Sequence, residues 1–200
     1  IHALQGMEYR DITVFTRRLY PQVNVQIPGL KYAQIRRTTP EAEDMLVVSP
    51  DGDRPLGEAL AEYDIIVNCT LQDTDHPLMF MTGAEAEHCK PGTLIVDVSC
   101  DDAMGFDFAR PTSFEAPTFP VSNGVVYYAV DHTPTYLWDA ATYEISQALL
   151  PFVATVMDGP ESWEADTIIR KAIEIKDGVI QNAAILRFQN REEAYPHKKK

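Results

Sequence analysis

Four short, almost purely apolar runs set the strongest limit on how this chain folds. They are DITVFT at residues 11–16, YDIIVNC at 63–69, LIVDV at 94–98 and VVYYAV at 125–130. Each run is rich in β-branched or aromatic residues and is shorter than an ordinary helix, so each predicts a strand. Because the runs are nearly continuous rather than alternating, they are typical of parallel strands that are covered on both faces.

Segments with helical character separate these runs. Residues 55–62 include good helix formers, and residues 78–89, with apolar side chains at Met79, Met81, Ala84 and Ala86, are the second helical segment. Lys90-Pro91-Gly92 then ends the second segment with two chain breakers before the third run begins. A strand, a helix and a strand in this order form a βαβ crossover, whose strands are parallel. We therefore expect an α/β fold built on a doubly wound parallel sheet.

Other segments are read less directly. Residues 31–37 are either a strand or the start of a helix, and residues 45–48 are a candidate strand. Residues 135–157 predict one long helix that is kinked at Pro151, because proline cannot donate the helical hydrogen bond. A second helix is expected at 163–175 and a turn at Asp177-Gly178. An extended segment at 179–188 and a solvated tail at 196–200 follow. The expected division is therefore a sheet domain at 1–134 and a helical segment at 135–200.

The chain starts in the middle of the expected fold. Doubly wound sheets that bind dinucleotides, the Rossmann-like folds, begin with a strand and a glycine-rich G-x-G-x-x-G turn. Neither is present here, and the first residues read as the end of a helix that stops at Gly6. The run at 11–16 would then be the second strand, with a gap where the central first strand belongs. We expect a C-terminal portion of a longer polypeptide; the alternative is a complete small α/β domain of another topology.

Charge and cysteine content narrow the function classes. The chain has 30 acidic and 17 basic residues, so its net charge is −13. That balance argues against a nucleic-acid surface and against docking on an anionic membrane. No transmembrane run and no signal peptide are evident, which predicts a cytoplasmic protein. Cys69, Cys89 and Cys100 fit no metal spacing, so we expect no metal site and read them as buried reduced thiols.

The second half of the chain carries a more specific pattern. It contains KPGTLIVDVSCDDAMGFDFARPTSFEAPTFPV, then GVVYYAVDHTP, and then a long helix that ends in ALLPFV. In this pattern the chain resembles the alanine dehydrogenase and transhydrogenase superfamily. Within it, the segments AMGFDFARPTSFEAPTF, VDHTPTYLWDAATYEISQALLPF and AIEIKDGVIQN are most similar to the N5-(carboxyethyl)ornithine synthases.

The resemblance implies a reaction. It is an NADP-dependent reductive condensation of pyruvate with the side-chain amine of ornithine or lysine, which gives an N-(carboxyethyl) amino acid. It also implies a homo-oligomer. Two alternatives stay open: an NAD(P)-dependent alanine-type dehydrogenase that uses ammonia, and a binding module without chemistry.

The residues after the first run indicate which cofactor is used. An acidic residue at the end of the second strand of a dinucleotide fold selects NAD, because it accepts from the ribose 2′-OH. Here the strand ends Thr16-Arg17-Arg18 without an acid. Two guanidiniums suit the 2′-phosphate of NADP, and Thr16 adds a hydroxyl donor. The alternative is that Arg17 and Arg18 are a solvated surface pair.

Polar residues after the later strands are candidates for the reaction. In the family, the Asp that follows the third run lies by the nicotinamide and substrate, and this implies that Asp101 holds the amine or moves a proton. Asp102 would point elsewhere, and Asp97, inside the strand, would bond loop backbone. His132 is a second catalytic candidate, as proton donor or carboxylate ligand. Alanine dehydrogenases have an Asn-Met pair where His132-Thr133 stand.

The remaining expected contacts lie at the same edge of the sheet, where ligands of such folds bind. We expect Asn68 and His76 near the cofactor as well. The other cofactor-binding candidates are Cys69, Thr70, Leu71, Val98, Ser99, Asp131 and Thr133.

Overall fold

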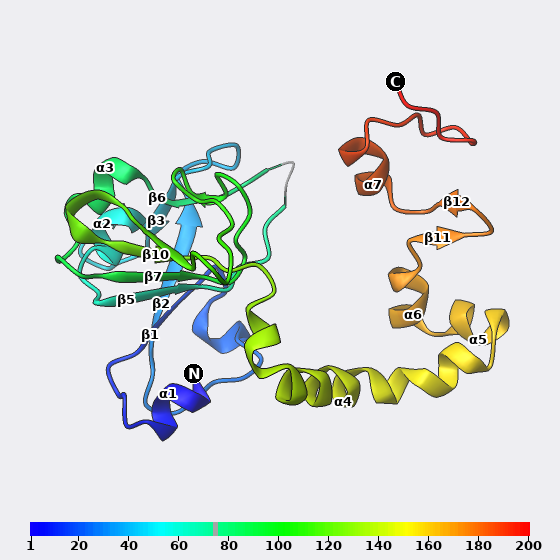
Figure 1. Cartoon of the computed structure of the whole chain (residues 1–200), viewed down its shortest axis with the longest axis horizontal. Coiled ribbons are helices and arrows are strands. Elements are labelled where there is room, and N and C mark those ends of the chain that lie inside the picture. Colours follow the sequence, from blue (N-terminus) through cyan, green and yellow to red (C-terminus); the bar gives the residue numbers. More distant parts are fainter. Residues whose placement is uncertain (74–75) are drawn as a thin grey trace. The chain divides into compact units, whose positions relative to one another are not determined.

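The computed structural model describes residues 1–73 and 76–200 and divides the chain into two compact units. The N-terminal unit is Ile1–Thr133 and the C-terminal unit is Pro134–Lys200 (Figure 1). No helix in the described part of the chain has the length and apolar character needed to cross a membrane.

The N-terminal unit is a mixed α/β structure with parallel strands at its centre, as expected. Its two four-stranded sheets have the orders β1-β2-β3-β4 and β5-β7-β10-β9 in the described residues. The first sheet contains β1 (Thr13–Thr16), β2 (Lys31–Arg37), β3 (Met45–Val47) and β4 (Arg54–Pro55). The second contains β5 (Ile65–Asn68), β7 (Leu94–Asp97), β9 (Thr118–Pro120) and β10 (Val126–Tyr128).

Strand direction confirms the crossover prediction and adds a departure from it. β1 pairs with β2 in parallel, and β7 pairs in parallel with both β5 and β10. β3 and β4 of the first sheet and β9 of the second are antiparallel to their neighbours, so one side of each sheet departs from a purely parallel arrangement. β1 and β5 are each the outer strand of their own sheet, which agrees with the expected gap between them.

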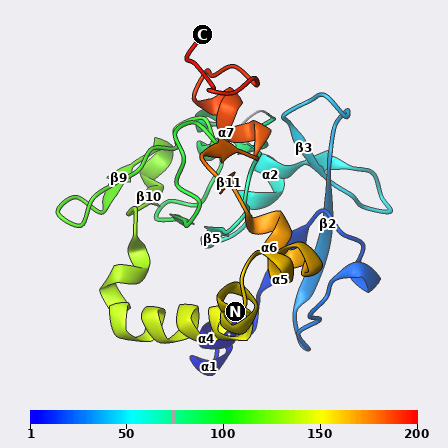
Figure 2. The ribbon, with the colours of Figure 1, turned by 90° about the vertical axis from the view of Figure 1, so that its right-hand side faces the viewer.

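One apolar core lies under both sheets. Ile35 and Met45 of the first sheet belong to the same buried cluster as Ile66, Ile95 and Tyr127 of the second. The helices of this unit are short: α1 (His2–Gly6), α2 (Leu56–Leu60), α3 (Gly83–Ala86) and the 3₁₀ turns η1 (Tyr20–Gln22) and η2 (Ser122–Gly124). In Figures 1 and 2, α2 lies beside β3, and α2 also contacts β6 (Met79–Met81). Leu56 and Leu60 of α2 are buried there.

Two expectations for this unit are wrong in detail. Residues 78–89 are not one helix, because Met79 and Met81 pair in parallel with β8 (Gly105–Phe106) and only the segment after Thr82 is helical. Thr82 starts α3 by accepting from the backbone N–H of Glu85. The strands are not covered on both faces either. Ile65 and Val67 are both 51% exposed, whereas Ile66 and Asn68 on the opposite face of β5 are buried.

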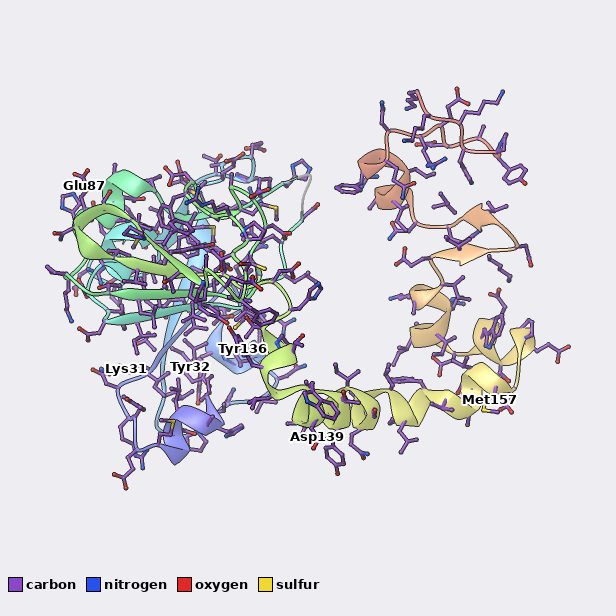
Figure 3. All side chains as sticks on the ribbon, in the orientation of Figure 1. Lys31, Tyr32, Glu87, Tyr136, Asp139 and Met157 are labelled. Atoms are coloured by element: carbon purple, nitrogen blue, oxygen red, sulfur yellow. The ribbon has the colours of Figure 1, made fainter. Side chains whose placement is uncertain are left out.

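The C-terminal unit is mainly helical. All but the first residue of η3 (Thr133–Leu137) belongs to it. It also contains α4 (Trp138–Met157), α5 (Pro160–Ala165), α6 (Thr167–Ala172), β11 (Ile175–Lys176), β12 (Val179–Ile180) and α7 (Ala183–Phe188). The long helix is confirmed, with Pro151 inside it and with three residues fewer at its start than expected. Figure 3 shows side chains on all sides of α4 between the labelled Asp139 and Met157, none of them buried.

Polar caps explain the wrong predictions in this unit. The expected helix at 163–175 is two helices, because Asp166 accepts from the backbone N–H groups of Ile168 and Ile169 and starts α6. The expected extended segment at 179–188 ends at β12, since Asn182 caps α7 in the same way. The tail is not fully solvated, because His197 is only 4% exposed.

Candidate functional site

Two neighbouring strand ends form a basic groove. Arg17 directly follows β1 and Thr38 directly follows β2, and the two strands are parallel, so both residues lie at the carboxyl edge of the sheet. The groove has a volume of about 540 Å³. It is lined by Arg17, Gln34, Ile35, Arg36, Arg37, Thr38, Thr39 and Pro40.

The three arginines of the groove differ in how far their charge is compensated. Arg36 is paired with Asp53, with Nε at 3.0 Å from the carboxylate. Arg37 donates to the backbone carbonyls of Ala42 and His76, the latter at 2.8 Å. Within the described residues, neither Arg17 nor Arg37 makes an ion pair. The groove therefore presents two cationic guanidiniums and suits an anion such as a phosphate monoester.

Thr16, Arg17 and Arg18, which the sequence suggested as one phosphate-binding group, differ in their surroundings in the structure. Arg17 lines the groove, whereas Arg18 is exposed and is not part of its lining. The Thr16 hydroxyl accepts from the backbone N–H of Arg18 at 3.2 Å, so it is engaged within the turn itself. Arg37, Thr38 and Thr39 were missed, because residues 31–37 read equally well as a strand or as a helix start. The strand interpretation would have placed Thr38 and Thr39 at the same edge as Arg17.

A second group of polar residues follows β7 and β10. The pKa of the Cys100 thiol is raised by burial and by the negative charges of Asp131, Asp97 and Asp101. Carboxylates that follow two parallel strands therefore gather around this thiol. Such an edge favours a cationic group, for example a protonated amine, over an anionic one.

The two expected catalytic residues are both exposed. Asp101 begins a turn in which the backbone N–H of Met104 donates to the Asp101 carbonyl at 3.3 Å. His132 follows β10 in the left-handed region, with φ at 60°. Its Nε2 lies 3.5 Å from the Asp131 carboxylate. No hydrogen bond or ion pair joins Asp101 to His132 in the part of the chain that the structure describes.

Several residues that we expected to contact the cofactor form hydrogen bonds with other groups of the protein. Ser99 donates its hydroxyl to the Thr70 carbonyl at 2.7 Å, and Thr133 donates to the Val130 carbonyl at 2.7 Å. Because Thr133 has a single hydroxyl proton, Tyr128 is the donor in its 2.9 Å contact with Thr133. The side chains of Cys69, Leu71, Val98 and Asp131 are exposed at the same edge. Of the three cysteines only Cys89 is buried, so the expectation of three buried thiols is wrong.

Asp97 bonds loop backbone, as expected from its place inside the strand. Its Oδ1 accepts from the N–H groups of Ser99 and Cys100 at 3.0 and 3.1 Å. Asn68 does not line the cofactor edge as expected, since it is buried and donates to Asp97 at 2.9 Å. Among the described residues, no group of three His, Cys, Asp or Glu side chains is arranged to hold a metal ion.

Comparison with known proteins shows which protein family the chain belongs to. Residues 23–183 match the family model described as "Alanine dehydrogenase/PNT, C-terminal domain". The chain belongs to this family. The match includes the strands β2, β5, β7 and β10 and the groove residues from Gln34 to Pro40, but not Arg17. It confirms the resemblance that the sequence pattern indicated.

Individual proteins that match the chain include an alanine dehydrogenase and an N(5)-(carboxyethyl)ornithine synthase. An alanine dehydrogenase from Mycolicibacterium smegmatis is 24% identical over 81% of this chain and 44% of its own length. An N(5)-(carboxyethyl)ornithine synthase from Lactococcus lactis is 32% identical over 46% of this chain and 29% of its own length. A solved L-alanine dehydrogenase superposes with a TM-score of 0.61 and 21% identity, over 93% of this chain and 48% of its own. The chain therefore spans less than half of the length of these relatives.

Proposed function

We propose that this chain is part of an NADP-dependent enzyme that condenses pyruvate with the side-chain amine of ornithine or lysine and reduces the product. The observation that carries the cofactor assignment is the basic groove, where Arg17 and Arg37 face a space without a carboxylate among the lining residues. An NAD site would instead place an acidic side chain there. The groove would hold the adenosine 2′-phosphate, with the Thr38 and Thr39 hydroxyls as additional donors.

The edge around Cys100 would hold the reacting groups. The amine attacks the pyruvate carbonyl and loses water to give an imine, which then accepts a hydride at carbon and a proton at nitrogen. NADPH, when bound, supplies the hydride. The negative charges of Asp101 and Asp131 would stabilise the cationic amine and iminium forms. Asp101 would accept the amine proton, and His132 would bind the pyruvate carboxylate.

A second function has support of its own. The alanine dehydrogenase relative matches 81% of this chain, whereas the carboxyethylornithine synthase relative matches 46%. An alanine-type dehydrogenase would use ammonia in place of the amino acid and would release alanine. The two reactions share the keto acid and the hydride, so they differ only in the amine.

One experiment separates these functions. The native polypeptide that contains this chain is incubated with pyruvate and NADPH or NADH, and with ammonia, ornithine or lysine as the amine. Loss of absorbance at 340 nm gives the rate, and mass spectrometry identifies the product. We expect fast NADPH oxidation with ornithine or lysine and an N-(carboxyethyl) product. Alanine formed from ammonia at a higher rate would establish the second function, and no reduction with any amine would exclude both.

A further inference from the structure

A buried carboxylate lies at the centre of the second sheet. Asp97 ends β7 and is 1% exposed. In addition to the loop N–H groups already described, its Oδ1 accepts from Asn68 Nδ2 at 2.9 Å and its Oδ2 accepts from the Tyr127 hydroxyl at 2.6 Å. Among the described residues no cation pairs with Asp97. Four uncharged donors therefore hold this side chain and satisfy both of its oxygens.

Asn68, Asp97 and Tyr127 form what we call the polar row. They come from three adjacent strands, and Asn68 pairs in register with Asp97. All three are buried, with exposures of 5%, 1% and 0%. Burial and the bond to Asp97 raise the pKa of Tyr127, so its hydroxyl keeps the proton that it donates. Polar groups cost free energy to bury, and apolar residues would pack at these positions without that cost. A fully satisfied buried network instead fixes one conformation of what surrounds it.

The polar row reaches the two loops above it. Asn68 Oδ1 accepts from the Thr70 N–H at 3.0 Å, and the Ser99 hydroxyl donates to the Thr70 carbonyl, so hydrogen bonds link the loop after β5 to the loop after β7. The loop after β7 also holds Cys100 and Ala103 at φ values of 33° and 52°, which side-chain-bearing residues rarely adopt. Such conformations persist only where surrounding bonds fix them. Asp97 bonds the N–H of Cys100, one residue before Asp101.

Gly105 shows how closely the returning loop approaches the polar row. Its φ is 81°, and a Cβ there would lie 3.3 Å from Asn68 Nδ2 and 3.1 Å from Gln72 Nε2. Its backbone N–H donates to the Leu78 carbonyl at 3.0 Å. The loop that carries Asp101 is therefore fixed at both ends, by Asp97 where it leaves β7 and by Gly105 where it enters β8.

We propose that the polar row is a positioning device that sets where Asp101 stands relative to the loop after β5. The proposal rests on the proposed function, in which this edge of the sheet holds the reacting amine. Asp97 and Tyr127 are then positioning residues: they touch no substrate and act through the loop that presents Asp101. A misplacement of about 1 Å at a reacting group is enough to lower a rate by up to about 10²-fold.

The test uses substitutions in the native polypeptide. Tyr127→Phe removes one donor from Asp97, Asp97→Ala removes the acceptor, and Asp97→Asn keeps an amide oxygen for the three N–H donors. Tyr128→Phe is the matched control, because this neighbouring hydroxyl bonds Thr133 and not the polar row. Each variant is measured for kcat, for the KM values, for the NADPH dissociation constant, and for hydrogen exchange in peptides covering 98–104 and 31–47.

We expect a loss confined to turnover. Tyr127→Phe should lower kcat about 10-fold and Asp97→Ala about 10²-fold, with the NADPH dissociation constant within about twofold of the original. Asp97→Asn should recover most of the loss, and Tyr128→Phe should match the original enzyme. Exchange should rise in 98–104 and stay unchanged in 31–47.

Two results would overturn the proposal. One is unchanged kcat and unchanged exchange at 98–104 in Tyr127→Phe, which also decides the matter if Asp97→Ala does not fold. The other is faster exchange throughout the unit with normal kcat per folded molecule, which is what a purely structural role gives. The exchange measurement needs no substrate. If exchange rises only at 98–104 but no amine is reduced even by the original protein, the polar row stands and the proposed function fails.

Discussion

In the proposed function, the choice between NADP and NAD depends on single charged side chains. Arg17 and Arg18 are adjacent and chemically identical, yet only Arg17 lines the basic groove. Their sequence context could not separate them, because a strand end leaves the direction of the next two side chains open. The groove also depends on Arg37, whose position became clear only from the pairing of β2 with β1.

The two arginines make a matched pair of variants. In the native polypeptide, Arg17→Ala should weaken NADPH binding by about 1.5–3 kcal/mol, because a charge-assisted bond to phosphate is lost. NADH binding should change little, and Arg18→Ala should leave both cofactors almost unaffected. Fluorescence titration with each cofactor measures this. Equal weakening of NADPH and NADH by Arg17→Ala would show that the groove holds no 2′-phosphate.

Asp101 and Asp102 offer a second matched pair. Both are exposed and begin the same turn, but only Asp101 contributes to the charge around Cys100. Asp101→Asn should lower turnover by roughly 10²–10⁴-fold, the range for a positioned acid–base group, while NADPH still binds. Asp102→Asn should cost far less. Steady-state kinetics of the two variants checks this, and equal damage from both would mean that the loop, rather than Asp101, was disturbed.

The reactivity of the Cys100 thiol depends on the negative charge of the nearby carboxylates, and it can be measured without enzymatic turnover. Its pKa is raised by burial, then by Asp131, Asp97 and Asp101, so less thiolate is present at pH 8 than in an ordinary cysteine. Asp131→Asn removes one negative charge and should lower that pKa, which increases alkylation by iodoacetamide at pH 8 by about 2- to 5-fold. Mass spectrometry of the Cys100 peptide gives the rate. Cys69, which is exposed and whose pKa Asp131 does not influence, is the internal control, and an unchanged Cys100 rate would contradict the proximity of Asp131.

At the scale of elements, the sequence predicted the parallel centre of the N-terminal unit well. The runs that became β5, β7 and β10 are apolar, β-branched and bounded by turn signals, so local preference and the final fold agree. The prediction of one helix at 78–89 was wrong, because Met79 and Met81 pair with β8 and only the residues after Thr82 are helical. That pairing joins segments distant in the chain, which periodicity does not reveal.

At the C-terminus, too, contacts between segments distant in the sequence were not predictable, in this case for the polar residue His197. Pro196-His197 followed by three lysines reads as solvated tail, yet His197 Nε2 accepts from the Ile180 N–H at 3.2 Å and Nδ1 donates to the Glu192 carbonyl at 3.1 Å. Both partners are backbone groups on separate segments, so no side-chain motif indicates the contact. The candidate site was only partly predictable for the same reason: Asp101 follows an obvious strand, whereas the role of Tyr127 depends on three strands being assembled.

His197 therefore fastens the last residues to β12. His197→Ala leaves the Ile180 N–H and the Glu192 carbonyl without these partners, which should make local opening easier by about 1–3 kcal/mol. Hydrogen exchange should accelerate at Ile180 and across 191–200. His88→Ala, at an exposed histidine of the other unit, should change neither region. If exchange at Ile180 stays slow in His197→Ala, the imidazole is not what holds this segment.

At the scale of the whole molecule, the proposed chemistry needs more than these residues hold. In the proposed function the described groups would bind the adenosine end and the reacting end, but no G-x-G-x-x-G turn occurs in the 200 residues. The N–H groups of that turn and its helix hold the pyrophosphate in dinucleotide folds. The relatives that match this chain are also more than twice as long as the region matched.

The isolated chain of 200 residues should therefore bind NADPH poorly and reduce no imine. Without the pyrophosphate contacts, the groove retains only the phosphate monoester interaction, and the reacting end lacks the rest of the enzyme. Titration with NADPH and an absorbance assay with pyruvate and ornithine check this on the purified fragment. Measurable NADPH oxidation by the fragment alone would show that these residues suffice.

The single apolar core beneath the two sheets has a consequence for folding. β1 and β5 share no hydrogen bonds, and a chain with two separately bonded sheets would ordinarily be free to lose one and keep the other. Here Ile35 and Met45 of the first sheet belong to the same buried cluster as Ile66, Ile95 and Tyr127 of the second sheet. Opening either sheet would expose the apolar surface of both, so the N-terminal unit should unfold as one cooperative body, with side-chain packing rather than strand pairing as the source of its cooperativity.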